Sequence, residues 1–179
     1  MTTTKLFSFA ALATAALVAL GQDAPKKPTG ATNGTIVTGL LAMSAFDPLL
    51  DREYVLNVIE EKNRVTVQLF RTDGRQKINA VLVRKDAKSE FRVLEVRAVP
   101  PMDPTTSTDA NSTVAFALAM LSHGKDVTAE GYKGLKLRGQ RIDDGNVFVG
   151  LISPPYNPSF GSHYILTPKG TIVSSGHGY

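Results

Sequence analysis

The stretch "RVTVQLFRTDGRQKINAVLV", residues 64–83, decides the fold class of this chain. The valine and leucine residues of its first half alternate with polar residues, as in a strand with one buried face. The turn pair Asp73-Gly74 follows, and residues 77–83 alternate again. The stretch therefore predicts a β-hairpin. The residues predicted to face the core are Val65, Val67, Leu69, Ile78, Ala80 and Leu82.

A third strand extends this hairpin into a meander. It covers residues 90–99 and follows a polar turn at 86–89. Leu94 and the alternate residues after it are expected on one face, and Val93 is out of phase with that set. The change of phase indicates a β-bulge near Val93-Leu94.

The segment that precedes the meander fits two structures. Asp47-Pro48 is typical of a helix start, and apolar residues recur every four positions after it. The same residues also alternate, and several are β-branched, which favours a strand. We therefore predict a helical turn over residues 48–51 and a strand over 52–60, with a helix over 52–60 as the alternative.

One strongly apolar helix is predicted after the meander. Residues 113–122, "TVAFALAMLS", are apolar on nearly every side, with capping side chains before them and Gly124 after them. With its capping residues the helix has about fifteen residues, which is too short to cross a membrane. We therefore expect it to pack against the sheet.

Strands resume beyond the helix. Alternation predicts them over residues 132–142, 147–152, 162–167 and 171–175, with turns at 143–146 and 168–170. The total is about nine strands and one helix, without a long sequence repeat. The predicted fold is mainly β, bordering on α+β: an antiparallel curled sheet, either a sandwich or a partial barrel, with one covering helix.

The N-terminus indicates export. A single cation precedes an apolar run that ends at Leu20, and small residues typical of a signal-peptidase site follow. We predict a signal peptide over residues 1–21, a flexible linker over 22–34 and a single β-rich domain over 35–179. The mature protein would lie in the periplasm or outside the cell, without a membrane span. An uncleaved N-terminal anchor is the alternative.

Composition removes several classes of chemistry. The chain has no cysteine, which excludes disulfides, thiolate metal sites and thiol nucleophiles. Its three histidines lack the spacing of metal ligands, and no phosphate-binding glycine motif occurs. We expect no metal and no cofactor. The basic-aromatic signatures of nucleic-acid-binding modules are also missing, so no nucleic acid is expected as a partner.

The charge distribution leaves two readings open. The formal net charge is +4, and ten Lys or Arg residues against four acidic residues lie between Lys62 and Arg97. This stretch fits contact with an anionic surface. It equally fits cations that cover solvent faces and protect edge strands.

The loop "SPPYNPSFGSHY", residues 153–164, is the candidate recognition surface. Three prolines stiffen it, and a rigid loop with aromatic side chains suits a sugar or a protein partner. The rings could instead close one end of the sheet. The candidate binding residues are Tyr156, Phe160, His163 and Tyr164.

No catalytic residue is assigned from sequence. A hydrolase would need at least two residues of a small set within hydrogen-bond reach in a cleft. That set is Ser162, His163, Asp143 and Asp144. Ser162 and His163 are neighbours on a predicted strand and should point to opposite faces, which disfavours a shared proton.

These observations favour an exported, non-catalytic binding or assembly domain at the cell envelope. Its partner would be an envelope polymer, an anionic surface or another protein. Homo-oligomers could arise if residues 34–43 add a strand to the sheet of another copy. An exported hydrolase and a passive structural component of the envelope are the alternatives.

Overall fold

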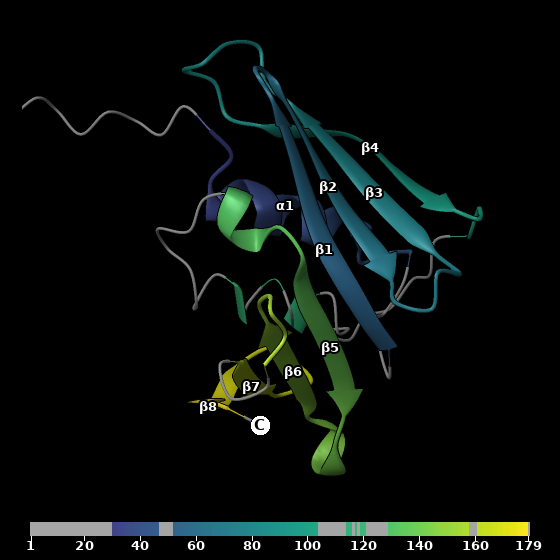
Figure 1. The fold of residues 1–179 in the computed structure, drawn as a ribbon, viewed down its shortest axis with the longest axis vertical. Helices are drawn as coiled ribbons and strands as arrows, with labels where there is room; N and C mark the ends of the chain where they lie inside the picture. The colour runs from purple at the N-terminus through teal and green to yellow at the C-terminus, as the bar shows by residue number, and fades with distance from the viewer. Residues whose placement is uncertain are drawn as a thin grey trace, which may run out of the picture.

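The computed structural model describes residues 30–46, 52–103, 114–115, 117, 119–120, 129–157 and 161–178. The predicted signal peptide over 1–21 and the predicted helical turn over 48–51 lie outside these residues. Within them, eight antiparallel strands form one curled sheet that does not close (Figure 1). The predicted fold class is confirmed.

The strands follow one another as two meanders. The first contains β1 (Arg52–Glu61), β2 (Arg64–Arg71), β3 (Lys77–Val83) and β4 (Arg92–Val99). The second contains β5 (Leu135–Arg141), β6 (Val147–Ile152), β7 (Ser162–Leu166) and β8 (Ile172–His177). The order across the sheet is β4-β3-β2-β1-β5-β6-β7-β8, so that β1 and β5 join the two meanders. The choice of a strand over 52–60 is confirmed.

Alternation gives the first meander its buried face, as the sequence predicts. The six predicted core residues of β2 and β3 are all fully buried. Gly74, in the predicted turn, has a φ of +72°, a conformation that glycine adopts without strain. The sequence therefore identifies both the strands and their inner face.

The predicted β-bulge lies in β4. Val81 pairs with Glu95 and Leu82 pairs with Val93, so Leu94 is the extra residue. The expectation that Leu94 shares a face with Val96 and Ala98 is wrong, since Leu94 is 62% exposed whereas Val96 and Ala98 pack against the core. The extra residue of a bulge leaves the regular alternation, which accounts for the difference.

Residues 34–43 belong to a helix, which corrects the predicted strand. The helix α1 (Asn33–Met43) begins after Thr32, whose hydroxyl accepts a hydrogen bond from the backbone N–H of Thr35. Its buried side chains pack against β2, β3 and β4. Because this segment is helical and buried, it cannot add a strand to another copy. Ala31, within the predicted linker, is also buried.

The apolar segment at 113–122 is helical wherever the structure describes it. Residues 114–115, 117 and 119–120 have helical conformation. The side chains of Ala115, Ala117, Ala119 and Met120 are buried in the same core cluster as α1. The predicted packing of this helix against the sheet is confirmed for these residues.

The architecture repeats, although the sequence does not. In each half, a helical segment precedes a four-stranded antiparallel meander. The halves meet where β1 pairs antiparallel with β5, from Arg52 opposite Gly139 to Leu56 opposite Leu135. Each outer strand also carries one bulge, at Leu94 in β4 and at Val173 in β8. The sheet is therefore built as two similar units joined through one strand pair.

A buried polar network also connects the two halves. The Asn33 side chain, at the start of α1, donates to the backbone carbonyl of Met120 at 3.1 Å. Its Oδ1 accepts a hydrogen bond of 2.6 Å from the hydroxyl of Tyr132. Tyr132 is part of η1, a 3₁₀-helix at Ala129–Tyr132 that precedes β5. Asn33 and Tyr132 are 5% and 2% exposed, so loss of the Tyr132 hydroxyl would take this donor away from the buried Oδ1 of Asn33.

A pair of glycine substitutions tests the packing of α1. A Cβ atom at Gly39 would lie 2.8 Å from Cγ2 of Val67, whose side chain is stiff. We expect Gly39→Ala to lower the free energy of unfolding by about 1–3 kcal/mol because of overpacking. Gly34→Ala is the control in the same helix, since its Cβ would meet only Thr32 Oγ1 at 3.7 Å. It should be neutral or stabilise by up to about 1 kcal/mol in urea unfolding.

The Asn33 network predicts a pH dependence of stability. Burial, and to a smaller extent the charge of Tyr164, raise the pKa of Tyr132 from 10.0 to about 12. The folded state therefore keeps a phenol neutral that the unfolded chain ionises near pH 10. The free energy of unfolding should fall as the pH rises from about 10 to about 12.

Urea unfolding of the protein and of Tyr132→Phe across this pH range measures the effect. The variant should be less stable at pH 8 by about 1–3 kcal/mol, because Asn33 loses its donor. The difference between the two proteins should then shrink as the pH rises. A constant difference would contradict the assignment.

Candidate functional site

The structure separates two of the predicted binding residues onto opposite faces of the sheet. Tyr164 points into the core, where its side chain is 7% exposed and burial raises its pKa. His163 lies on the outer face, where its ring stacks on that of Phe148 with centroids 5.8 Å apart. Its Nδ1 lies 2.8 Å from the carbonyl oxygen of Gly178. The two residues therefore do not form one surface.

The other two predicted residues belong to the preceding loop. Tyr156 is exposed, and its hydroxyl donates to the carbonyl of Gly134 at 2.9 Å. The ammonium group of Lys136 lies 4.5 Å from the centre of its ring. These contacts hold Tyr156 against the start of β5, and its φ of +64° is unusual for a residue with a side chain. Phe160 lies outside the described residues.

The residues considered for hydrolysis are not brought together. Asp143 belongs to a short 3₁₀-helix in the β5–β6 turn, Asp143–Gly145, and Asp144 follows it there. Ser162 begins β7 beside Leu151, at the opposite end of β6 from that turn. Ser162 instead lies opposite His177 of β8, with 3.1 Å between its Oγ and Nδ1 of His177. The sequence alone does not predict this pair, because its two residues lie fifteen positions apart and meet only when β8 pairs with β7.

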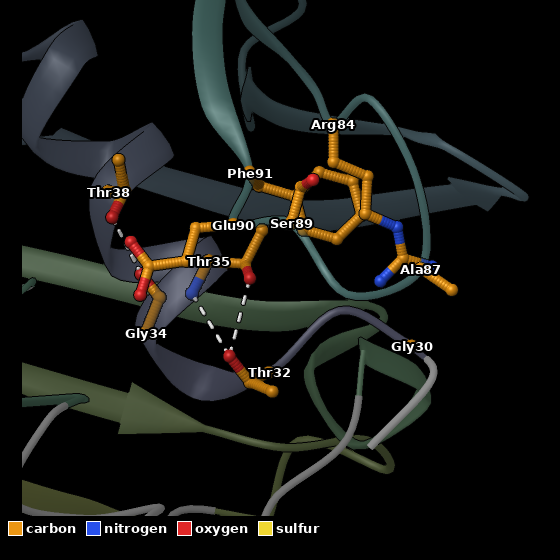
Figure 2. A pocket seen from close by; sticks show the side chains of 10 residues that line it. All are labelled: Gly30, Thr32, Gly34, Thr35, Thr38, Arg84, Ala87, Ser89, Glu90 and Phe91. Atoms are coloured by element: carbon orange, nitrogen blue, oxygen red, sulfur yellow. Dashed lines mark hydrogen bonds between the residues drawn. The ribbon is translucent and has the colours of Figure 1, made fainter. Parts of the chain in front are cut away.

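A hollow of about 340 Å³ lies elsewhere, between the first turns of α1 and the β3–β4 loop (Figure 2). Ligand sites are concave and of comparable size, with a few polar groups that fix orientation. The hollow is small enough to hold a single compact group. Its lining comprises Gly30, Thr32, Gly34, Thr35, Thr38, Arg84, Ala87, Ser89, Glu90 and Phe91.

The wall contributed by α1 carries hydroxyl groups at helical spacing. Thr32, Thr35 and Thr38 recur every three residues and therefore lie along one side of the helix. Thr38 donates to the carbonyl of Gly34 at 2.8 Å, and the hydroxyls of Thr32 and Thr35 lie 3.3 Å apart. The Thr38 hydroxyl donates in its bond to Gly34, so its oxygen keeps acceptor capacity for a ligand.

The wall contributed by the β3–β4 loop is fixed by Asp86. One oxygen of its carboxylate accepts hydrogen bonds of 2.9 Å from the backbone N–H groups of Lys88 and Ser89 and from the Ser89 hydroxyl. The Ser89 hydroxyl, followed by the backbone N–H of Lys88, lowers the pKa of Asp86. This wall is therefore shaped before any ligand arrives, which reduces the entropy lost on binding.

Arg84 forms the far side of the hollow. Its guanidinium lies over the Phe91 ring, 4.6 Å from the ring centre, and donates to the carbonyl of Lys62 at 2.9 Å. In Figure 2 the Glu90 carboxylate points toward α1, whereas the Arg84 guanidinium lies on the other side of the ring. The lining therefore carries one negative charge, on Glu90, and one positive charge, on Arg84, and the two lie on different sides of the Phe91 ring.

A second hollow adjoins the first, since both are lined by Arg84 and Ala87. It measures about 660 Å³ and lies between the β1–β2 turn and the start of the β3–β4 loop. Its charged side chains are three acids and three bases. They are Glu60, Glu61, Asp86, Lys62, Arg84 and Lys85. This balance gives no preference for an anion.

The local positive charge predicted from sequence is consequently dispersed. Arg71 and Arg75 contact Asp73 at one end of the meander, and Arg97 contacts Glu95 on β4. At the other end, the cations around the two hollows alternate with carboxylates. The distribution supports cations that cover solvent faces and edges rather than one concentrated anion-binding patch.

Comparison with known proteins adds no functional assignment. No protein-family model matches this chain, and neither a curated protein nor a solved structure gives a match. Among the described residues, no three His, Asp or Glu side chains gather as metal ligands do. In the same part of the chain, no helix has the length and apolarity needed to cross a membrane.

Proposed function

We propose that this chain is an exported, non-catalytic binding domain of the cell envelope, and that its ligand occupies the hollow between α1 and the β3–β4 loop. The observation that carries the proposal is the preformed lining of this hollow. Asp86 fixes one wall, the Thr32 cap fixes the other, and Arg84 is held between Phe91 and Lys62. Groups held in this way suit recognition.

The chemistry of the lining favours a neutral ligand rich in hydroxyl groups. Three threonines and Ser89 offer hydroxyls, Glu90 accepts hydrogen bonds, and Arg84 donates them. An anion would meet the Glu90 carboxylate, and a cation would meet Arg84. A polysaccharide of the envelope satisfies the donors and acceptors without a net charge. The adjoining hollow would accommodate a second sugar unit.

Titration with a neutral oligosaccharide tests the ligand class. The probe is a β-1,4-linked tetramer of N-acetylglucosamine, followed by ¹⁵N–¹H NMR of the full chain. Amide shifts should concentrate in residues 30–38 and 84–91 and saturate at millimolar probe. Glu90→Gln should weaken binding, because the amide replaces one acceptor oxygen with a donor. Glu53→Gln, on β1 and outside the hollow, is the matched control.

Two results would contradict this function. Shifts that leave residues 30–38 and 84–91 unaffected would place any sugar site elsewhere. Tighter binding of polyphosphate than of the sugar, weakening steeply as salt increases, would indicate an anionic ligand instead.

The proposed export is tested separately, by the mass of the exported protein. The apolar run that ends at Leu20 supports removal of residues 1–21. Intact-mass analysis of the protein recovered from a bacterial periplasm or culture medium should therefore give a chain that begins at Gln22. Full-length chain that stays in the cytosol would contradict export while leaving the ligand proposal testable.

A further inference from the structure

The open sheet ends in two edge strands of different character. β4 carries three charged side chains, Arg92, Glu95 and Arg97, which discourage pairing with another strand. β8 has the sequence "IVSSGH" and contains no acidic residue, lysine or arginine. The chain therefore protects one end of its sheet by charge and leaves the other end uncharged.

β8 is also accessible along nearly its whole length. Val173 is 60% exposed and Ile172 is 36% exposed, and the following serines are exposed as well. An edge strand that displays apolar side chains and unpaired backbone groups is a template for strand addition. The two exposed apolar residues would lie beside any strand that pairs there.

Contacts to β7 hold β8 in place at its C-terminal end. His177 lies within 3.1 Å of the Ser162 hydroxyl, and Gly178 donates to the carbonyl of Gly161 at 2.8 Å. The His163 ring covers the backbone of Gly176, since a Cβ there would lie 2.7 Å from the ring. The strand is therefore ordered before it meets a partner, which lowers the entropy lost on pairing.

We propose that β8 pairs antiparallel with β8 of a second copy of this chain, and that the two sheets become one continuous sheet across a two-fold axis. This interface goes beyond the proposed ligand site and uses none of its residues. The molecule already contains the same type of junction, because β1 and β5 join two four-stranded meanders.

The distribution of charge along the chain favours a second copy of this protein as the partner of β8. From Gly145 to the C-terminus, Lys169 is the single charged side chain, although the whole chain has a net charge of +4. Pairing through β8 brings the least charged parts of two copies together and keeps the basic meanders at the far ends. The charged β4 edge then stops further addition, so assembly closes at two copies.

The bulge in β8 defines the register. Val173 is the extra residue, because Ser174 pairs with Ile165 and Ile172 pairs with Leu166. Ser174–His177 is the regular part of the strand. A two-fold axis between antiparallel strands of one sheet runs perpendicular to the sheet and places one residue opposite its own copy. We therefore place Ser175 opposite Ser175 of the second copy, with the two side chains on the same face. A pair of such short strands buries less surface than a typical stable dimer, so the dimer should dissociate on dilution.

Sedimentation equilibrium of the full chain over a wide concentration range tests the interface. We expect a reversible monomer–dimer equilibrium. Ser175→Lys places two like charges close together across the axis and should weaken the dimer at least tenfold. Leu94→Lys makes a comparable change on an exposed residue of β4 and should leave the dimer unchanged. Circular dichroism confirms that both variants fold.

A variant with the opposite charge at position 175 tests the interface more directly than Ser175→Lys alone. Ser175→Glu alone should also be monomeric, whereas an equimolar mixture of the Ser175→Lys and Ser175→Glu chains should dimerise again. A chain that stays monomeric at millimolar concentration would overturn the proposal. Equal weakening by Leu94→Lys, or failure of the mixture to recover dimers, would overturn it as well.

Discussion

The antiparallel pairing of β1 with β5 is the constraint on which the rest of the structure depends. Each half alone is a four-stranded meander with a helical segment on one face. Pairing over Arg52–Leu56 and Leu135–Gly139 converts two small units into one sheet with a shared core. A small unit buries too little apolar surface to be stable on its own, and the shared core increases the buried apolar area of both halves. The Asn33–Tyr132 hydrogen bond fixes how the halves meet beneath the sheet.

Much of the sheet could be predicted because its strands have one buried face. Alternation in β2 and β3 marks the core residues, and the change of phase at Val93-Leu94 reveals the bulge. The sequence pattern does not predict α1, for the opposite reason. Its glycines and β-branched residues have low helix propensity, although Ile36, Leu40 and Met43 have helical spacing. Burial against the first meander outweighs that propensity in the folded chain.

The candidate site could not be predicted in the same way. Its two walls come from residues 30–38 and 84–91, which lie about fifty positions apart and meet because α1 packs over β3 and β4. Neither wall has a recognisable motif. Aromatic residues in a proline-rich loop predict a recognition surface, yet strand alternation places His163 and Tyr164 on opposite faces of the sheet. Local sequence reports local geometry, whereas this hollow depends on long-range packing.

The burial of Asn33 has a consequence for production of the protein in eukaryotic cells. Asn33-Gly34-Thr35 matches the acceptor sequence for N-linked glycosylation, which is added to the nascent chain in the secretory pathway. In the folded protein the amide nitrogen that would carry the glycan donates to Met120 inside the core. A glycan there would exclude the side chain from its place and separate the two halves. In secretion from yeast or mammalian cells, glycosylation of Asn33 would therefore prevent correct folding. Expression in bacteria, which do not add this glycan, avoids the problem.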